Sequence, residues 1–246
     1  MGELEGVGIV VTRPDDAEDR LSRRLASEGA RVLFFPALEI VPLDPPASDG
    51  PFDAALFTSP AAVHHGWPRL VGRFPERLLA PGSGTRAALL AAGASTVRIP
   101  ARGAGMAALL QSLPADFLAG NHLLVVCGEP LNRKSLDVLA ERGAEVTPWP
   151  VYARRPCENP HPLSDWIHAG EADVIMASSS AAVTALMKLP KSGVTGIGWI
   201  VSSPRVARAA AQAGAEVVAT AQSAEARDLS VAAIHWWQSE GKRVRA

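Results

Sequence analysis

The sequence predicts an α/β protein made of two flavodoxin-like parallel-sheet domains, one discontinuous and the other inserted into it, joined by a two-stranded β-ribbon hinge. Short apolar, β-branched segments alternate with helical patterns along the chain, which is typical of βαβ units and parallel sheets. The length of 246 residues suits two small domains. The chain also repeats itself, and the order of the repeated blocks differs between the two copies.

The elements follow one another regularly. Residues 7–11 form an apolar run typical of a buried strand, and residues 14–28 follow with a helical pattern that ends at Gly29. Residues 31–35 are the next predicted strand. The alternation continues with predicted strands at residues 53–58, 78–81, 96–99, 122–127, 145–149, 173–177, 199–202 and 216–219. About ten strands are too many for one small open sheet and suit two sheets of five.

Internal repeats indicate how these strands divide between the domains. Three pairs of blocks align, at offsets of 120, 121 and 114 residues: 53–63 with 173–183, 81–93 with 202–214, and 10–36 with 124–150. The third block comes first in one copy and last in the other, which indicates a circular permutation between two copies of one fold. General similarity among βα units is the alternative explanation.

The permutation predicts the domain boundaries. Residues 1–35 plus 158–246 form the discontinuous domain, and residues 44–148 form the inserted one. Residues 36–43 and 149–157 cross between them and form the hinge ribbon. Both crossings leave the carboxyl end of a second strand, so both carboxyl edges should face each other. Ligands bind outside the carboxyl ends of parallel strands, so we expect the binding site in the cleft between the domains.

Composition and charge exclude several classes of protein. Hydrophobic residues make up 48% of the chain and charged residues 20%, so the chain folds. A net charge of −1 lacks the basic excess of a nucleic-acid binder. The two cysteines cannot make a disulfide framework or a four-cysteine zinc site. There is no signal-like start and no apolar run of about 18 residues, so we expect a cytoplasmic protein without membrane contact.

Turns rich in serine and threonine follow most of the predicted strands. Their hydroxyls cap helices, and the free N–H groups at helix N-termini attract anions. Capping alone explains any one turn, but several such turns on two facing edges predict a site for a ligand with several carboxylates or phosphates. The predicted substrate-binding residues are Arg13, Thr58, Ser59, Gly84, Thr85, Arg86, Gly128, Arg133, Ser178, Ser179, Ser202 and Ser203.

Two other functions fit parts of the pattern. Gly82-x-Gly84-x-x-Ala87 matches a dinucleotide fingerprint, but no acidic ribose ligand follows about 20 residues later. The prediction of a nucleotide-dependent enzyme therefore depends on a weak motif. A non-enzymatic two-domain protein that binds a polycarboxylate, similar to periplasmic solute-binding proteins, shares the hinged plan. The missing signal sequence and the small domains count against it.

The order of the motifs resembles the uroporphyrinogen-III synthase family. The resemblance runs through Val11-Thr-Arg-Pro14, Gly29-Ala with Pro36-Ala-Leu-Glu-Ile40, Phe57-Thr-Ser-Pro-Ala-Ala-Val63, Gly84-Thr85 with Gly93, Val151-Tyr152, Ser178-Ser-Ser-Ala-Ala-Val183, and Val201-Ser-Ser-Pro-Arg-Val-Ala207 with Gly214. It implies two flavodoxin-like domains joined by a β-ladder, in a monomer without cofactor or metal. Ala177 departs from the Phe-Thr of the first copy, so Ser178 and Ser179 carry that turn alone.

The resemblance also implies a reaction. A lyase of this family cyclises hydroxymethylbilane to uroporphyrinogen III, with loss of water and inversion of ring D, in haem, sirohaem or cobalamin-type tetrapyrrole biosynthesis. The bilane closes by itself to the wrong isomer, so the enzyme imposes geometry through proximity and orientation. A transient contact with hydroxymethylbilane synthase is also expected.

Tyr152 is the candidate catalytic residue. It is the only tyrosine in the chain, and we expect it in the hinge ribbon facing the cleft. A reference pKa of about 10 keeps a phenol protonated at neutral pH, so it could help the substrate hydroxyl to leave. The alternative is that Tyr152 only packs within the ribbon.

Overall fold

The computed structural model describes residues 2–13, 20–46, 50–70, 75–190 and 192–241. It divides into two compact units. Unit 1 comprises Met1–Glu39 and Arg155–Ala246, and unit 2 comprises Ile40–Arg154. Unit 2 is therefore continuous in sequence, whereas unit 1 is built from both ends of the chain.

Unit 1 is built on a five-stranded parallel sheet with the order β10-β9-β8-β1-β2. In chain order within the unit this is 2-1-3-4-5, a doubly wound order. Ile9 in the central strand lies opposite Val32 on one side and Val174 on the other. The strands are β1 (Gly8–Val11), β2 (Arg31–Phe34), β8 (Val174–Ala177), β9 (Gly198–Val201) and β10 (Glu216–Thr220).

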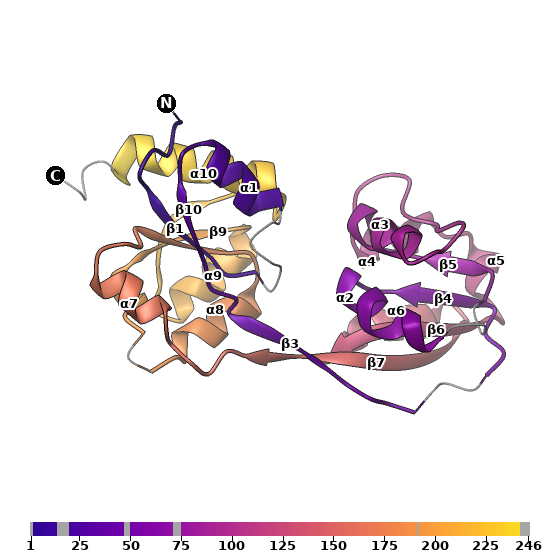
Figure 1. Cartoon of the computed structure of the whole chain (residues 1–246). Coiled ribbons are helices and arrows are strands. Elements are labelled where there is room, and N and C mark those ends of the chain that lie inside the picture. The colour runs from indigo at the N-terminus through magenta and orange to yellow at the C-terminus, as the bar shows by residue number, and fades with distance from the viewer. Residues whose placement is uncertain (1, 14–19, 47–49, 71–74, 191, 242–246) are drawn as a thin grey trace. The chain divides into compact units, whose positions relative to one another are not determined.

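Helices cover both faces of this sheet (Figure 1). Alternate residues of β1 explain why, since successive strand side chains point to opposite faces. Ile9 and Val11 pack with the core beneath α1 and α10, whereas Val10 packs with the core beneath α7, α8 and α9. The helices are α1 (Arg20–Ser27), α7 (Leu163–His168), α8 (Ser180–Met187), α9 (Pro204–Gln212) and α10 (Ala226–Trp236), with short helical turns at η2 (Val194–Gly196) and η3 (Trp237–Gly241).

Unit 2 has a second five-stranded sheet, with the order β3-β7-β6-β4-β5. Its four inner strands, from β7 to β5, pair in parallel. The Leu43 N–H donates to the Val151 carbonyl and the Cys157 N–H to the Ala37 carbonyl, so β3 runs antiparallel to β7. The strands are β3 (Leu38–Pro42), β4 (Ala54–Phe57), β5 (Arg77–Leu79), β6 (His122–Glu129) and β7 (Glu145–Pro156).

The helices of unit 2 also lie on both faces of their sheet. Helices α2 and α3 cover one face over Phe57 and Val126, and α4, α5 and α6 cover the other over Leu56 and Val125. Their bounds are α2 (Pro60–Gly66), α3 (Ser83–Ala91), α4 (Met106–Ser112), α5 (Ala115–Leu118) and α6 (Arg133–Glu141), with a 3-10 turn at η1 (Trp67–Arg69).

The prediction of two parallel-dominated sheets in an α/β protein is confirmed, and one predicted strand is wrong. Residues 96–99 form no strand and make only a single parallel bridge, between Leu79 and Arg98. Strand β5 is itself three residues long, so it offers a short edge for pairing. The fifth place in the sheet is taken instead by β3, on the opposite side. The predicted helix over residues 14–28 is seen from Arg20, and residues 14–19 lie outside the described residues.

Gly29 ends its helix as predicted, and Gly143 does the same at the equivalent place in the repeat. Gly29 follows α1 with a φ of 87°, and Gly143 follows α6 with a φ of 88°. This left-handed conformation is strained for residues with a Cβ atom, so glycine is the residue that ends a helix and turns directly into the next strand.

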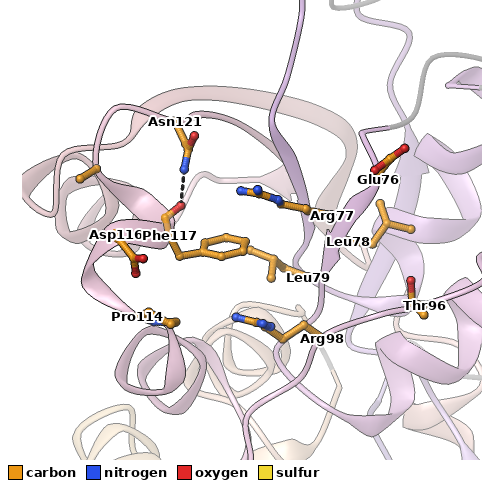
Figure 2. A pocket seen from close by; sticks show the side chains of 11 residues that line it. Glu76, Arg77, Leu78, Leu79, Thr96, Arg98, Pro114, Asp116, Phe117 and Asn121 are labelled. Atoms are coloured by element: carbon orange, nitrogen blue, oxygen red, sulfur yellow. Dashed lines mark hydrogen bonds between the residues drawn. The ribbon is translucent and has the colours of Figure 1, made fainter.

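A cavity of about 680 Å³ opens in unit 2 at the amino end of β5. Figure 2 shows the Phe117 ring between the side chains of Arg77 and Arg98, whose guanidinium carbons lie 5.7 and 5.3 Å from the ring centre. The Asn121 side-chain amide donates a hydrogen bond of 2.8 Å to the Phe117 carbonyl. None of the predicted binding residues lines this cavity.

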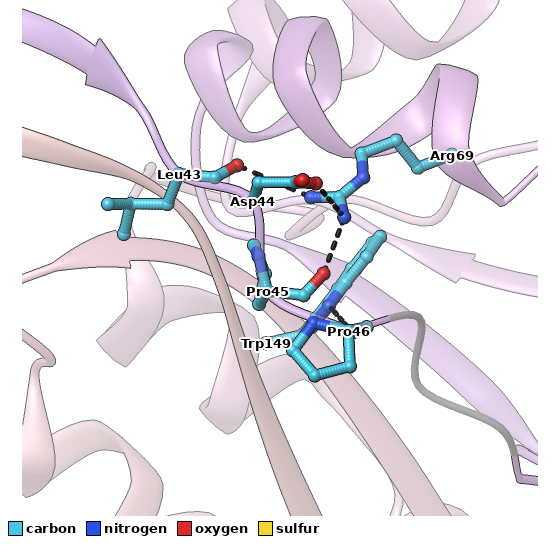
Figure 3. Close-up of polar contacts among 6 residues, drawn as sticks. All are labelled: Leu43, Asp44, Pro45, Pro46, Arg69 and Trp149. Carbon is cyan, nitrogen blue, oxygen red and sulfur yellow. Dashed lines mark hydrogen bonds and ion pairs between the residues drawn. The ribbon is translucent and has the colours of Figure 1, made fainter.

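Arg69 anchors the segment through which the chain enters unit 2. Figure 3 shows its guanidinium donating to the carbonyls of Leu43 and Pro45 and to the carboxylate of Asp44, at 2.7 Å for the carboxylate. The same guanidinium lies 5.2 Å from the centre of the Trp149 ring, and the Trp149 indole donates to the Pro46 carbonyl at 3.0 Å. One arginine therefore ties this entry segment to β7.

We expect Arg69→Met to lower the free energy of unfolding by about 1–3 kcal/mol, because several carbonyls lose their donor together. Equilibrium urea unfolding followed by circular dichroism measures the change. Arg102→Met replaces an exposed arginine of the same unit and is the matched control. Equal stability of the two variants would show that the Arg69 contacts contribute nothing.

Candidate functional site

The turn after β4 is held at the carboxyl edge of the unit 2 sheet. The backbone N–H and the hydroxyl of Thr58 both donate to the Val126 carbonyl, at 3.0 and 3.2 Å, which fixes the turn against β6. Ser59 then caps α2, because its Oγ accepts the Ala62 N–H at 3.1 Å. The predicted capping role of Ser59 is thus confirmed.

Tyr152 of β7 joins this turn from the next strand but one. Its hydroxyl lies 2.9 Å from Ser59 Oγ and accepts a hydrogen bond of 2.6 Å from the Arg154 guanidinium. The guanidinium also lies 5.1 Å from the centre of the Tyr152 ring. Gly128 pairs directly with Tyr152, and a Cβ atom at Gly128 would come within 2.3 Å of the ring. Glycine at this position is therefore what lets the ring approach β6 so closely.

Burial favours the alternative for Tyr152, in which the ring packs within the structure. Its side chain is 0% exposed and belongs to the apolar core of unit 2. The ring of His65 lies 6.0 Å away. Burial, and to a smaller extent the neighbouring His64, lower the pKa of His65, so this imidazole is uncharged near neutral pH. Arg154 is thus the cation that faces the phenol.

A small cavity of about 190 Å³ lies at the same edge. It combines backbone and side chains from the ends of β4, β6 and β7 with the start of α6. Thr58, Gly128 and Arg154 line it together with Asn132, which caps α6 by accepting the Ser135 N–H. The cavity thus joins two of the predicted residues to donors suited to a carboxylate.

The other predicted residues of unit 2 are placed differently. Gly84 is exposed at the start of α3, where a Cβ atom would lie 3.9 Å from Pro60, so the starts of α2 and α3 are neighbours. Thr85 is 5% exposed, and its side chain packs inside the unit rather than offering a hydroxyl to a ligand. Arg86 and Arg133 are exposed on α3 and α6.

Unit 1 gathers its predicted residues at the carboxyl edge of its own sheet. Ser179 caps α8 and Ser203 caps α9, through the N–H groups of Ala182 at 3.1 Å and Val206 at 3.4 Å. The Ser202 hydroxyl is buried and donates to the Ser178 carbonyl at 2.9 Å, so it links the two turns and is not free for a ligand. Arg13, after β1, donates to the Ala224 carbonyl beyond β10.

Sequence reasoning missed two residues at the carboxyl edge of the unit 2 sheet, Arg154 and Cys127. Arg154 stands two positions after Tyr152 in the same strand, so both side chains point to one face, and this spacing could have revealed the pair. Cys127 also lines the small cavity, but a single buried cysteine at the end of an apolar strand carries no signal that distinguishes it from core.

The described residues contain no group of three or more metal-ligating side chains arranged around a common point. Within the same residues, every helix is too short or too polar to cross a lipid bilayer.

Comparison with known proteins decides the family. The family model described as uroporphyrinogen-III synthase HemD matches residues 19–230. This chain belongs to the uroporphyrinogen-III synthase family. It therefore catalyses the cyclisation of hydroxymethylbilane in tetrapyrrole biosynthesis and is a lyase, and the reading as a binding protein without activity is not favoured.

Solved structures of uroporphyrinogen-III synthases share the fold. One is a mutant enzyme from the extremely thermophilic bacterium Thermus thermophilus, at 20% identity and a TM-score of 0.57, with 95% of this chain and 100% of that chain covered. Another is the enzyme from Helicobacter pylori, at 14% identity and a TM-score of 0.63, with 93% of this chain and 99% of that chain covered. No match was found among curated protein sequences.

Cys127 gives a direct test of how closed the carboxyl edge of unit 2 is. Burial raises the pKa of its thiol from 9.0 to about 11. Because the thiolate is the reactive form, we expect alkylation by iodoacetamide at pH 9 to be about 50-fold slower in the folded than in the urea-unfolded protein, measured in a Cys157→Ala background. The unfolded thiol ionises first, so stability should also fall as the pH rises from about 9 towards 11. Equal rates for the two states at pH 9 would contradict the burial.

Proposed function

We propose that the carboxylates of hydroxymethylbilane bind at the carboxyl-terminal edges of both sheets. The supporting observation is that Ser59, Ser179 and Ser203 each cap a helix that begins directly after a parallel strand. Such starts present unpaired N–H groups and the positive end of the helix dipole, and both favour carboxylates. The substrate carries an acetate and a propionate on each pyrrole, so several such turns can hold it at once.

We propose that this binding selects the isomer. Donors fixed by the backbone hold the bilane in a folded arrangement in which the substituted α-carbon of ring D attacks, gives a spiro intermediate and recloses with the ring inverted. Orientation alone supplies several kcal/mol of discrimination, and loss of a hydroxymethyl oxygen is intrinsically easy. A site of neutral donors with few catalytic groups suits that chemistry.

The same proposal includes the domain plan of the chain. Residues 1–35 plus 158–246 and residues 44–148 act as two domains, and residues 36–43 and 149–157 act as a hinge ribbon. The pairing of β3 with β7 supports it, because the chain passes from unit 1 to unit 2 in β3 and returns in β7. We further propose a cytoplasmic monomer that contacts hydroxymethylbilane synthase transiently, as the family resemblance implies.

One assay tests the proposed function. The purified protein is mixed with enzymatically generated hydroxymethylbilane, and the oxidised products are separated by chromatography. We expect the type III isomer to dominate, whereas the reaction without protein gives type I by spontaneous closure. Type I product alone, at any protein concentration, would remove the proposed function.

The backbone donors can be tested one at a time at α8. Ser180 is its first residue, where α2 and α9 already have Pro60 and Pro204, so proline fits this position and removes the N–H donor together with the hydroxyl. We expect Ser180→Pro to raise KM about fivefold, which corresponds to about 1 kcal/mol, with kcat nearly unchanged. Ser180→Ala keeps the N–H and measures the share of the lost hydroxyl. An unchanged KM in Ser180→Pro would show that this donor does not hold substrate.

A further inference from the structure

We propose that the Ser59 hydroxyl, and not Tyr152, donates the proton to the leaving oxygen of hydroxymethylbilane. Tyr152 then returns a proton to Ser59 through the hydrogen bond between their hydroxyls. The proposal rests on the proposed function of this edge. It assigns the contact with the reacting atoms to Ser59 and makes Tyr152 a positioning residue behind it.

The directions of the hydrogen bonds follow from the chemistry of the three side chains. A guanidinium has donors only, so in the Arg154–Tyr152 contact of 2.6 Å the phenol oxygen accepts. If Ser59 also donated to that oxygen, the phenolic hydrogen would be left without an acceptor in a fully buried side chain. Buried donors are nearly always paired. The Tyr152 hydroxyl therefore donates to Ser59 Oγ across the 2.9 Å contact.

This direction leaves the Ser59 hydrogen available. Ser59 Oγ accepts from Tyr152 and from the Ala62 N–H at 3.1 Å, so both of its lone pairs are engaged. Among the described residues no acceptor is recorded for the hydrogen of Ser59, which is half-buried at the start of α2. Tyr152, by contrast, is fully enclosed, so a substrate atom cannot reach its hydroxyl.

The repeat provides an internal comparison. Ser179 stands 120 residues after Ser59 and caps α8 with the same 3.1 Å bond to the N–H group three residues later. Its hydroxyl has no phenol behind it, because Tyr152 is the only tyrosine in the chain. Capping therefore needs the serine alone, and the tyrosine contact is an addition that capping does not explain.

The proposed step balances. The bond between the hydroxymethyl carbon and its oxygen breaks with the electron pair on oxygen, which takes the Ser59 proton and leaves as water. Ser59 takes the Tyr152 proton, and the resulting phenolate faces Arg154, the nearest cation. The substrate loses one proton as the ring forms, and that proton restores the pair. Among the described residues, the charged or titratable groups in contact with Tyr152 are Arg154 and His65, and the His64 ring contacts His65.

Steady-state kinetics on the full chain test the proposal. We expect Ser59→Ala to lower kcat about 100-fold with KM within threefold, and Ser59→Thr, which keeps a hydroxyl and a cap, to retain most of kcat. Tyr152→Phe should lower kcat by a similar factor, and the double variant should lose little more than Ser59→Ala, because the two residues act in series. The residual product should stay type III.

Folding controls separate chemistry from capping. Ser59→Asn keeps the cap and removes the hydroxyl, so it should fold with nearly the wild-type Tm yet show the low kcat. Ser179→Ala loses the equivalent cap and should lower Tm as Ser59→Ala does, without changing the shape of the kcat–pH profile. In the wild type, kcat should fall at alkaline pH because the catalytic acid loses its proton. Both Ser59→Ala and Tyr152→Phe should lack this fall.

The outcomes are distinguishable from those of the proposed function. Wild-type kcat in Ser59→Asn, or losses in Ser59→Ala and Tyr152→Phe that multiply in the double variant, would overturn the relay while type III product in the wild type upholds the proposed function. A wild-type protein that yields only type I product would remove both.

Discussion

Parallel strand pairing is the constraint on which the rest of this structure depends. It brings the carboxyl ends of the parallel strands of a sheet to one edge, so turns far apart in the sequence become neighbours. In unit 1, the turns after β8 and β9 are linked by the Ser202 hydroxyl. In unit 2, the turn after β4 is held by the Val126 carbonyl of β6. The serine caps then fix the residue at which each helix begins at that edge.

Much of this arrangement follows from residues that can be read along the chain. The repeated blocks predict the strand order of unit 1, and Gly29 and Gly143 mark equivalent helix ends because their backbone is left-handed. The capping serines are predictable because a hydroxyl before a helix satisfies its free N–H groups. The absence of a strand at residues 96–99 could not be predicted in this way, because pairing there depends on the length of β5, which is a tertiary property.

The same distinction holds for the candidate site. Sequence position placed Tyr152 in the right strand, but its burial depends on Gly128 of β6 leaving room for a ring. That contact joins residues from different repeats of βα structure and has no local signature. The contact between Arg154 and Tyr152 is different, because the two residues stand two positions apart in one strand and their spacing could have revealed the pair. The contact between Gly128 and Tyr152 is set by packing across strands and not by neighbours in sequence.

The insertion of unit 2 within unit 1 has a consequence for biosynthesis. Ile9 of β1 pairs with Val174 of β8, so the central pairing of the unit 1 sheet joins residues from the two ends of the polypeptide. During translation, residues 40–154 are complete while the first unit still lacks its three remaining strands. The early segment with β1 and β2 then carries an apolar strand edge that waits for its partner, and exposed edges of this kind favour aggregation. We therefore expect the segment with β1 and β2 to need protection from aggregation until β8 has been synthesised.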